Sequence, residues 1–130
     1  MKKEAVIPTL KKTLAKNKTV QFAYLFGSFL KRKDARDIDV AVYLKSRKDS
    51  WKRAQEIGDV LEKAIDYTWP IDVHALNEAV PAFRFRVLAD GKLLLERNKA
   101  ERLTWEAHAM SQYQDIKPML DFYDRKFLSR

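Results

Sequence analysis

Residues 24–44, YLFGSFLKRKDARDIDVAVYL, contain the pattern that decides the fold. The run from Val20 to Phe26 is almost continuously apolar or aromatic and stops at Gly27, which predicts a buried strand. A basic loop follows from Phe29 to Arg36, and the run from Asp37 to Leu44 is rich in β-branched residues, which predicts a second strand. The stretch therefore predicts two strands joined by a basic loop.

Two carboxylates lie at the start of the second predicted strand. Because side chains alternate along a strand, Asp37 and Asp39 share one face, while Ile38 and Val40 point to the other face, into the core. Neighbouring carboxylates repel each other unless a cation or a proton lies between them. Oxygen ligands at this density favour Mg²⁺ over zinc. An isolated Asp-x-Asp pair is expected by chance, so its weight comes from this position in a strand.

Asp72 repeats the arrangement in a third strand, predicted over residues 69–76. If this strand neighbours the second one, three carboxylates converge, as phosphoryl transfer with two metal ions requires. We predict that Asp37 and Asp39 bridge two Mg²⁺ ions, and that Asp72 completes the ion that activates the acceptor hydroxyl. His74 follows Asp72 onto the same face, and we interpret it as structural because no second histidine lies at metal-ligand spacing.

The turn after the first strand predicts a site for a nucleotide triphosphate. Gly27 ends a buried strand, where a glycine lets the backbone approach a phosphate closely. The Ser28 hydroxyl and nearby amides can donate hydrogen bonds to phosphate oxygens. Lys31 and Arg36 lie in the connecting loop, and we predict that they contact the same phosphates.

The rest of the chain predicts helices that back a small sheet. Val6, Leu10 and Leu14 repeat at helical spacing. The other predicted elements are a helix that Ser50 caps and that ends near Ile65, a short helix from Pro81 to Ala89 that Gly91 terminates, and a possible edge strand from Lys92 to Glu96. The resulting order, αβ-βαβ-αβ-α, is an α+β fold with a small mixed β-sheet backed by helices.

A long helical segment is predicted after Asn98, which forms a capping box with Glu101. Its apolar residues recur in steps of three or four and are predicted to share one packed face: Leu103, Ala107, Met110, Tyr113, Ile116, Leu120, Tyr123 and Phe127. Pro118 is predicted to kink or split the helix. We interpret the aromatic side chains of this segment mainly as packing residues, with a protein-docking surface as the alternative.

Composition narrows the class of protein. The chain has 130 residues, 46% of them hydrophobic, which suits one globular domain, and its lack of cysteine excludes thiolate metal sites and cysteine nucleophiles. No apolar run approaches the roughly 20 residues that span a bilayer and no secretory signal is present, so we expect a cytoplasmic protein without a membrane partner. The net charge of +8 attracts polyanions. Because no nucleic-acid-binding motif accompanies the charge, nucleic acid is not expected as a direct substrate.

These residues together resemble the DNA polymerase β-like nucleotidyltransferases, most closely the minimal nucleotidyltransferase (MNT) group. The matching residues are Tyr24-Leu25-Phe26-Gly27-Ser28, Asp37-Ile38-Asp39-Val40-Ala41-Val42 and Ile71-Asp72-Val73. Eight residues separate Gly-Ser from Asp-x-Asp here, against about ten in the family, and Arg36 stands where serine is common. The resemblance covers about residues 6–97. It implies a polymerase β-like fold and one nucleotidyltransferase domain over residues 1–130, with C-terminal helices over about 98–129.

The resemblance also implies a function. MNT proteins pair with HEPN-domain proteins in toxin–antitoxin modules, so the chain is expected to be an Mg²⁺-dependent antitoxin that transfers AMP from ATP to a tyrosine of a HEPN toxin. Two alternatives stay open: a nucleotidyltransferase for a small, aminoglycoside-like molecule, and a non-catalytic antitoxin that neutralises its partner by docking. Homo-oligomers and hetero-oligomers are both left open by the sequence.

Overall fold

The computed structural model describes residues 1–128 of the chain. Its elements follow the predicted order: α1 (Lys3–Ala15), β1 (Val20–Phe26), the 3-10 helix η1 (Ser28–Leu30), β2 (Ile38–Leu44), α2 (Ser50–Ala64), β3 (Ile71–Ala75), α3 (Pro81–Asp90), β4 (Lys92–Glu96), α4 (Lys99–Tyr123) and the π-helical turn η2 (Asp124–Leu128). The predicted end of the C-terminal helices, near residue 129, lies outside the described residues.

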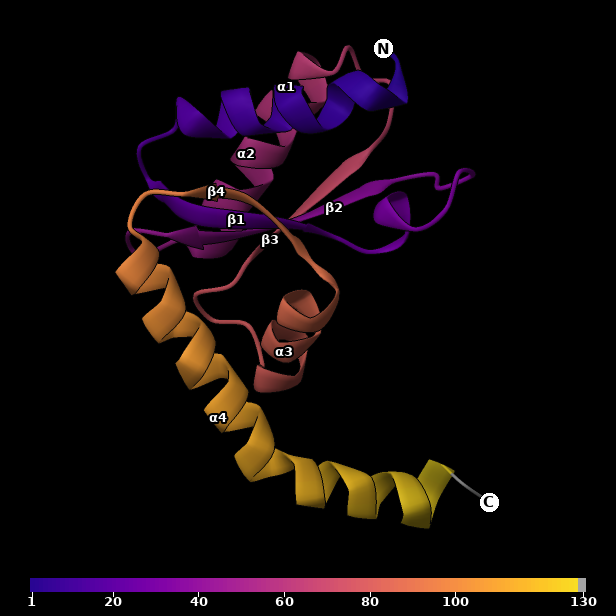
Figure 1. Cartoon of the computed structure of the whole chain (residues 1–130), viewed down its shortest axis with the longest axis vertical. Helices are drawn as coiled ribbons and strands as arrows, with labels where there is room; N and C mark the ends of the chain where they lie inside the picture. Colours follow the sequence, from indigo (N-terminus) through magenta and orange to yellow (C-terminus); the bar gives the residue numbers. More distant parts are fainter. Residues whose placement is uncertain (129–130) are drawn as a thin grey trace.

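The four strands form one mixed sheet in the order β3-β2-β1-β4 (Figure 1). β1 pairs antiparallel with β2 and with β4, whereas β2 and β3 are parallel and are connected through α2. A parallel pair needs such a crossover because the chain must return to the same end of the sheet. β4 lies at one edge, as predicted, and β3 lies at the other. The α+β fold with a small mixed sheet is therefore confirmed.

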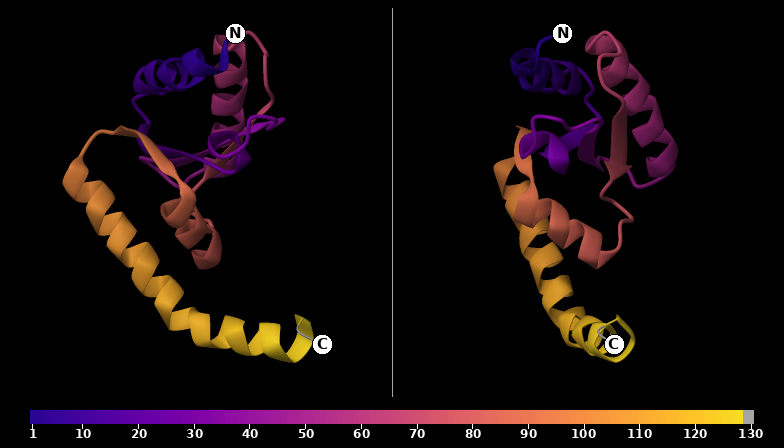
Figure 2. Two further views of the ribbon diagram at one scale, coloured as in Figure 1. Left: turned by 45° about the vertical axis from the view of Figure 1, so that its right-hand side comes forward. Right: turned by 90° about the vertical axis from the view of Figure 1, so that its right-hand side faces the viewer.

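Helices cover both faces of the sheet (Figure 2). α1 and α2 lie over one face, where the predicted residues Val6, Leu10 and Leu14 are buried against side chains of β1, β2 and β3. α3 and the first part of α4 lie over the other face, where a smaller cluster forms around Phe22 and Val87. The strands thus bury both of their faces, which explains why β1 is almost continuously apolar.

The start of α2 differs from the prediction. Ser50 does not cap the helix: it is the first helical residue and is buried, and the capping position belongs to Asp49. The backbone of Asp49 is left-handed, with φ of 55°, and no side chain accepts a hydrogen bond at this helix start. Aspartate tolerates this conformation better than most residues, which lets the chain turn sharply into the helix one residue earlier than predicted.

α4 starts as predicted, because the Asn98 side chain accepts a hydrogen bond from the backbone N–H of Glu101 at 3.0 Å. The predicted packed face is wrong in its first half, since Leu103 and Met110 are each 47% exposed while Ala109 is buried. The physical reason is Trp105, whose ring packs against Phe22 with the centroids 5.3 Å apart and thereby sets the rotation of the helix.

The end of α4 leaves the body of the molecule. Its last part turns away from the direction of its first part (Figure 1), and Pro118 lies inside the helix, where it removes one backbone hydrogen bond as predicted for a kink. Tyr113 still packs, stacking on Phe85 with ring centroids 4.0 Å apart. Phe122, Tyr123 and Phe127 are more than half exposed, so the interpretation of these three residues as core is wrong. None of the helices within residues 1–128 is long and apolar enough to cross a membrane.

Candidate active site

The register of three strands brings two of the predicted aspartates together. Asp39 of β2 pairs with Phe26, the last residue of β1, and on its other side with Asp72 of β3. Neighbouring strands are about 4.8 Å apart, and paired residues point to the same face of a sheet. The carboxyl groups of Asp39 and Asp72 therefore lie side by side, on the face that α3 covers.

Asp37 directly precedes β2 and completes the acidic group. Burial raises the pKa of Asp39 above its usual range, and the negative charges of Asp37 and Asp72 raise it further. His74 acts in the opposite direction and lowers this pKa. The carboxyl group of Asp39 is therefore close enough to Asp37, Asp72 and His74 for their charges to act on it.

His74 also belongs to this site and is only partly buried. Its Nε2 lies 3.7 Å from Oδ1 of Asp39. Its ring packs against two phenyl rings that also contact each other, with centroid distances of 5.7 Å to Phe26 and 5.3 Å to Phe83. The alternation of β3 places His74 on the face of Asp72, but only the pairing of β2 with β3 puts it beside Asp39.

Gly27 makes room for the acidic group. It has φ of 85° and ψ of −162°, a conformation that favours glycine. A Cβ at this position would lie 2.7 Å from Oδ2 of Asp39, closer than non-bonded atoms approach. The glycine is thus required for the Asp39 carboxyl to lie against the backbone at the end of β1, in addition to any role toward phosphate.

The predicted phosphate-binding residues separate into two groups. Ser28, Arg36 and Asp37 line one pocket of about 430 Å³ formed by the loop between β1 and β2. Arg36 is exposed and makes no ion pair with any other residue of the described chain, so its charge is available to a ligand. Lys31 does not line this pocket, and its Nζ lies 3.4 Å from Oδ1 of Asp90 in α3.

A second pocket, of about 570 Å³, lies on the other side of the acidic group, along β3. Asp72 and His74 contribute to it, together with side chains from the start of α2 and from the segment that leads into α3. Trp51, Val80 and Phe83 form apolar parts of this pocket. Their only signal in the sequence is that they are apolar side chains at helix starts, which does not distinguish them from core residues.

The acidic group suits a divalent cation by its chemistry. All donors at its centre are carboxylate oxygens, the ligands that Mg²⁺ prefers. The pKa of Asp39 is raised first by burial and then by the charges of Asp37 and Asp72, and a cation at this position would offset those charges. As the side chains stand, no three acidic or imidazole groups within residues 1–128 are gathered closely enough to hold one ion.

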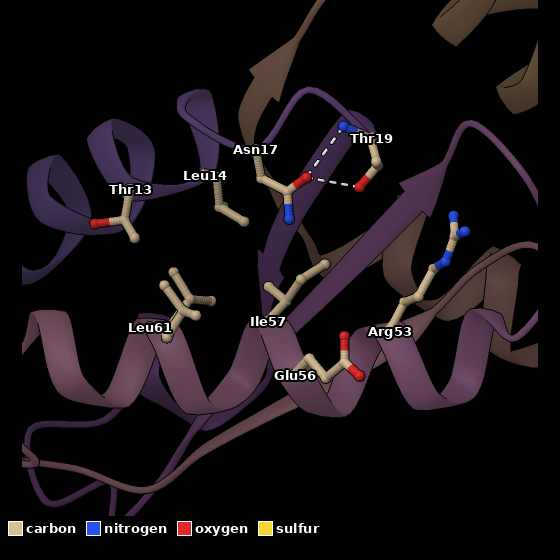
Figure 3. A pocket seen from close by; sticks show the side chains of 9 residues that line it. Thr13, Leu14, Asn17, Thr19, Arg53, Glu56, Ile57 and Leu61 are labelled. Atoms are coloured by element: carbon tan, nitrogen blue, oxygen red, sulfur yellow. Dashed lines mark hydrogen bonds between the residues drawn. The ribbon is translucent and has the colours of Figure 1, made fainter.

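A third pocket, of about 320 Å³, lies between α1 and α2 and is remote from the acidic group (Figure 3). Its floor is apolar, with Leu14, Ile57 and Leu61. The Asn17 carboxamide oxygen at its edge already accepts hydrogen bonds from the backbone and the hydroxyl of Thr19. Among the described residues, Glu56 is the one carboxylate that lines this pocket, and none of the three predicted aspartates nor Gly27 is among its lining residues.

The chain also resembles known proteins in sequence and in fold. The family model described as Polymerase beta, Nucleotidyltransferase matches residues 8–100. No curated protein matches the chain in sequence.

Several solved structures resemble the chain. One, of a tri-AMPylated Shewanella oneidensis HEPN toxin in complex with MNT antitoxin, aligns with a TM-score of 0.65 and 23% identity over 92% of this chain and 97% of that chain. A structure of the toxin–antitoxin MntA-HepT aligns with a TM-score of 0.64 and 24% identity over 91% of this chain and 96% of that chain. A toxin–antitoxin structure with AMP-PNP aligns with a TM-score of 0.65 and 25% identity over 88% of this chain and 95% of that chain. At these identities the likeness establishes the fold.

Proposed function

The chain belongs to the polymerase beta nucleotidyltransferase family, and we propose that it transfers AMP from ATP, with Mg²⁺, to a tyrosine hydroxyl of a HEPN toxin and so acts as its antitoxin. The observation that carries the proposal is the register that aligns Asp39 with Asp72 and places Gly27 against the Asp39 carboxyl. This arrangement supports a nucleotidyltransferase whose acidic group is intact.

The acidic residues have distinct proposed roles. Asp37 and Asp39 would hold two Mg²⁺ ions, and Asp72 would be a further ligand of one of them. When bound, such ions neutralise the charge of the triphosphate and lower the pKa of the attacking hydroxyl. Carboxylates that repel one another in the metal-free protein are typical of such sites, because the ion removes the repulsion.

The loop between β1 and β2 is proposed to bind the triphosphate. Ser28 and Arg36 share a pocket with Asp37, so a phosphate held there lies next to the acidic group. Arg36 supplies a guanidinium that can donate two hydrogen bonds to phosphate oxygens. Gly27 lets the phosphate approach the backbone, and Lys31, which now pairs with Asp90, contributes at most to the outer phosphate.

The proposed reaction is a displacement at the α-phosphorus of ATP. The acceptor oxygen forms a bond to this phosphorus while the bond from the phosphorus to the oxygen bridging to the β-phosphate breaks. Pyrophosphate leaves with that electron pair, and the hydroxyl proton is released to solvent. The side chains named above position the triphosphate and the acceptor for this in-line geometry.

The proposed partner rests on the family and on the neighbouring structures, which are toxin–antitoxin complexes. We propose one nucleotidyltransferase domain whose core, about residues 6–97, carries the reaction, followed by C-terminal helices that contact the toxin. The end of α4 extends away from the sheet (Figure 1). The side chains of Phe122, Tyr123 and Phe127 in this part of the chain are more than half exposed, which supports such a contact.

The proposal is tested by incubating the protein with α-³²P-labelled ATP, Mg²⁺ and a HEPN toxin produced from the adjacent gene. Label is expected on the toxin with the wild type and with Asp59→Asn, which changes an exposed carboxyl of α2 far from the site. No label is expected with Asp39→Asn. Absence of labelling by wild-type protein, or equal labelling by Asp39→Asn, contradicts the proposal.

The exposed apolar end of α4 also favours a second candidate, in which the chain neutralises a toxin by docking alone. The two functions make opposite predictions for the acidic group. If toxin inhibition persists in Asp37→Asn and Asp39→Asn but is lost when Phe122 and Phe127 are both replaced by serine, docking is the function.

A further inference from the structure

The two pockets beside the acidic group lie on opposite sides of Asp39. The loop pocket with Ser28 and Arg36 follows β1, whereas the pocket along β3 contains Asp72. An in-line displacement requires the acceptor to arrive opposite the leaving pyrophosphate. Because the loop pocket is proposed to hold the phosphates, the acceptor must come from the side of β3.

The pocket along β3 has an apolar rim that packing inside the chain does not explain. Trp51 is 75% exposed and Val80 is 66% exposed, although both line this pocket. Phe83 forms the inner wall, and its ring is fixed edge-to-face against Phe26, with centroids 5.6 Å apart and planes at 83°. Exposed apolar side chains grouped at a pocket mark a binding surface, and these suit a planar ring.

The charged residues of the pocket exclude some acceptors. Asp72 and Glu78 line it, and no lysine or arginine is among its lining residues within the described chain. An acceptor that carries phosphates, such as the end of a nucleic acid, would find no basic side chain among these lining residues to bind its phosphates. The volume of about 570 Å³ accommodates a ligand of side-chain size.

We infer that the pocket along β3 is the acceptor subsite, that it takes an uncharged phenol, the side chain of a tyrosine, and that Trp51 and Val80 position this ring. The inference rests on the proposed function and goes beyond it, because it assigns acceptor selectivity to residues outside the acidic group. The phenol ring stacks on the Trp51 indole and packs against Val80, and its hydroxyl points toward Asp72.

The first test measures binding without chemistry. N-acetyl-L-tyrosinamide is titrated into the full chain, and the indole N–H signals of its three tryptophans are followed by NMR, with Trp51→Ala to assign the signal of Trp51. The expected result is a saturable shift of the Trp51 signal, with Trp69 and Trp105 unaffected. No shift overturns the inference. A shift caused instead by ATP, and competed by N-acetyl-L-tyrosinamide, also overturns it, because the pocket would then hold the nucleoside.

The second test separates acceptor binding from chemistry. With N-acetyl-L-tyrosinamide as acceptor, Trp51→Ala is expected to raise KM for the acceptor about tenfold and to leave KM for ATP unchanged. Val80→Asn should act in the same direction, and it keeps the start of α3 because asparagine is a favoured capping residue at this position. Tyr67→Ala is the matched control, since Tyr67 is 68% exposed and lies outside the pocket.

The two tests distinguish failure of the acceptor subsite from failure of the proposed function. Transfer by the wild type with unchanged acceptor KM in both variants overturns the subsite and leaves the proposed function standing. A Trp51 shift together with no labelling of the HEPN toxin by the wild type supports the subsite and contradicts the proposed function. AMP transfer to an aminoglycoside such as kanamycin, with the same dependence on Trp51, overturns the assignment of a phenol.

Discussion

The Asp39 carboxyl lies so close to Gly27 that no side chain fits there: a Cβ on Gly27 would lie 2.7 Å from Oδ2 of Asp39. The glycine is therefore part of the acidic group's geometry, because it lets the central carboxyl lie against the backbone where β1 ends. The positive φ of 85° adds a second reason why another residue is poorly tolerated there.

Gly27→Ala is expected to lower both activity and stability. The methyl group displaces the Asp39 carboxyl, and a misplacement of this kind costs about a hundredfold in the rate of transfer. The backbone conformation costs about 2 kcal/mol in the free energy of unfolding, measured by urea denaturation. Gly58→Ala is the control: its Cβ would meet its neighbours at 3.5 Å, an ordinary contact, and it lies within α2, so this variant should be as stable as the wild type or more so. Equal behaviour of the two variants would contradict the role of Gly27.

Asp39→Asn is expected to abolish transfer and yet to stabilise the metal-free protein. The substitution removes a charge that Asp37 and Asp72 repel. The rate should fall about a thousandfold, while Tm without Mg²⁺ rises. Saturating Mg²⁺ should raise the Tm of the wild type by about 3 °C and leave that of Asp39→Asn almost unchanged. A wild-type Tm that does not respond to Mg²⁺ would argue against the metal site.

The pH dependence of stability follows from the raised pKa of Asp39 in the folded protein. Between its ordinary value of 3.8 and the raised value, the folded state binds more protons than the unfolded state. The contribution of Asp39 to stability is thus fully present below the ordinary value and is lost as pH rises through the raised value. The stability of the wild type relative to Asp39→Asn, measured by denaturation at a series of pH values without Mg²⁺, should therefore fall with rising pH and then level off. A difference that is constant with pH would show that the pKa is not raised.

Arg36→Ala is expected to raise KM for ATP about tenfold, because one charge-assisted contact to phosphate is lost. Lys31→Ala should have a much smaller effect, since Lys31 lies outside the loop pocket and pairs with Asp90. Steady-state kinetics with ATP as the varied substrate checks both. A larger effect of Lys31→Ala would mean that the lysine leaves Asp90 when the nucleotide binds.

Tyr24→Phe is expected to loosen α4 from the sheet. The Tyr24 hydroxyl donates a hydrogen bond to Oε1 of Glu106 at 2.7 Å, and burial raises the pKa of this tyrosine far above its usual range. The lost bond should cost about 1 kcal/mol of unfolding free energy, because Arg102 still pairs with Glu106 at 2.5 Å. Tyr43→Phe is the matched control, since no hydrogen bond of the Tyr43 hydroxyl occurs within residues 1–128. Chemical denaturation of the two variants measures the difference.

The sequence by itself determined the elements and the composition of the acidic group. Alternation along β2 places Ile38 and Val40 in the core and Asp39 on the opposite face, and a glycine after an apolar run marks the end of β1. These features are local, because the side-chain period and the backbone freedom of glycine depend only on neighbouring residues. For the same reason the order of helices and strands was predictable along the whole described chain.

Only the tertiary structure decided which residues meet. Asp72 reaches Asp39 because β3 pairs in parallel with β2, and the same pairing puts His74 beside the carboxyl. The packing of α2 against β3 brings Trp51 to the pocket along β3. The rotation of α4 about its own axis likewise could not be predicted from the sequence. Several apolar stripes of this helix are possible, and the choice depends on the contacts of Trp105 with Phe22 across the sheet surface. Such contacts join residues distant in sequence, whose register no local pattern encodes.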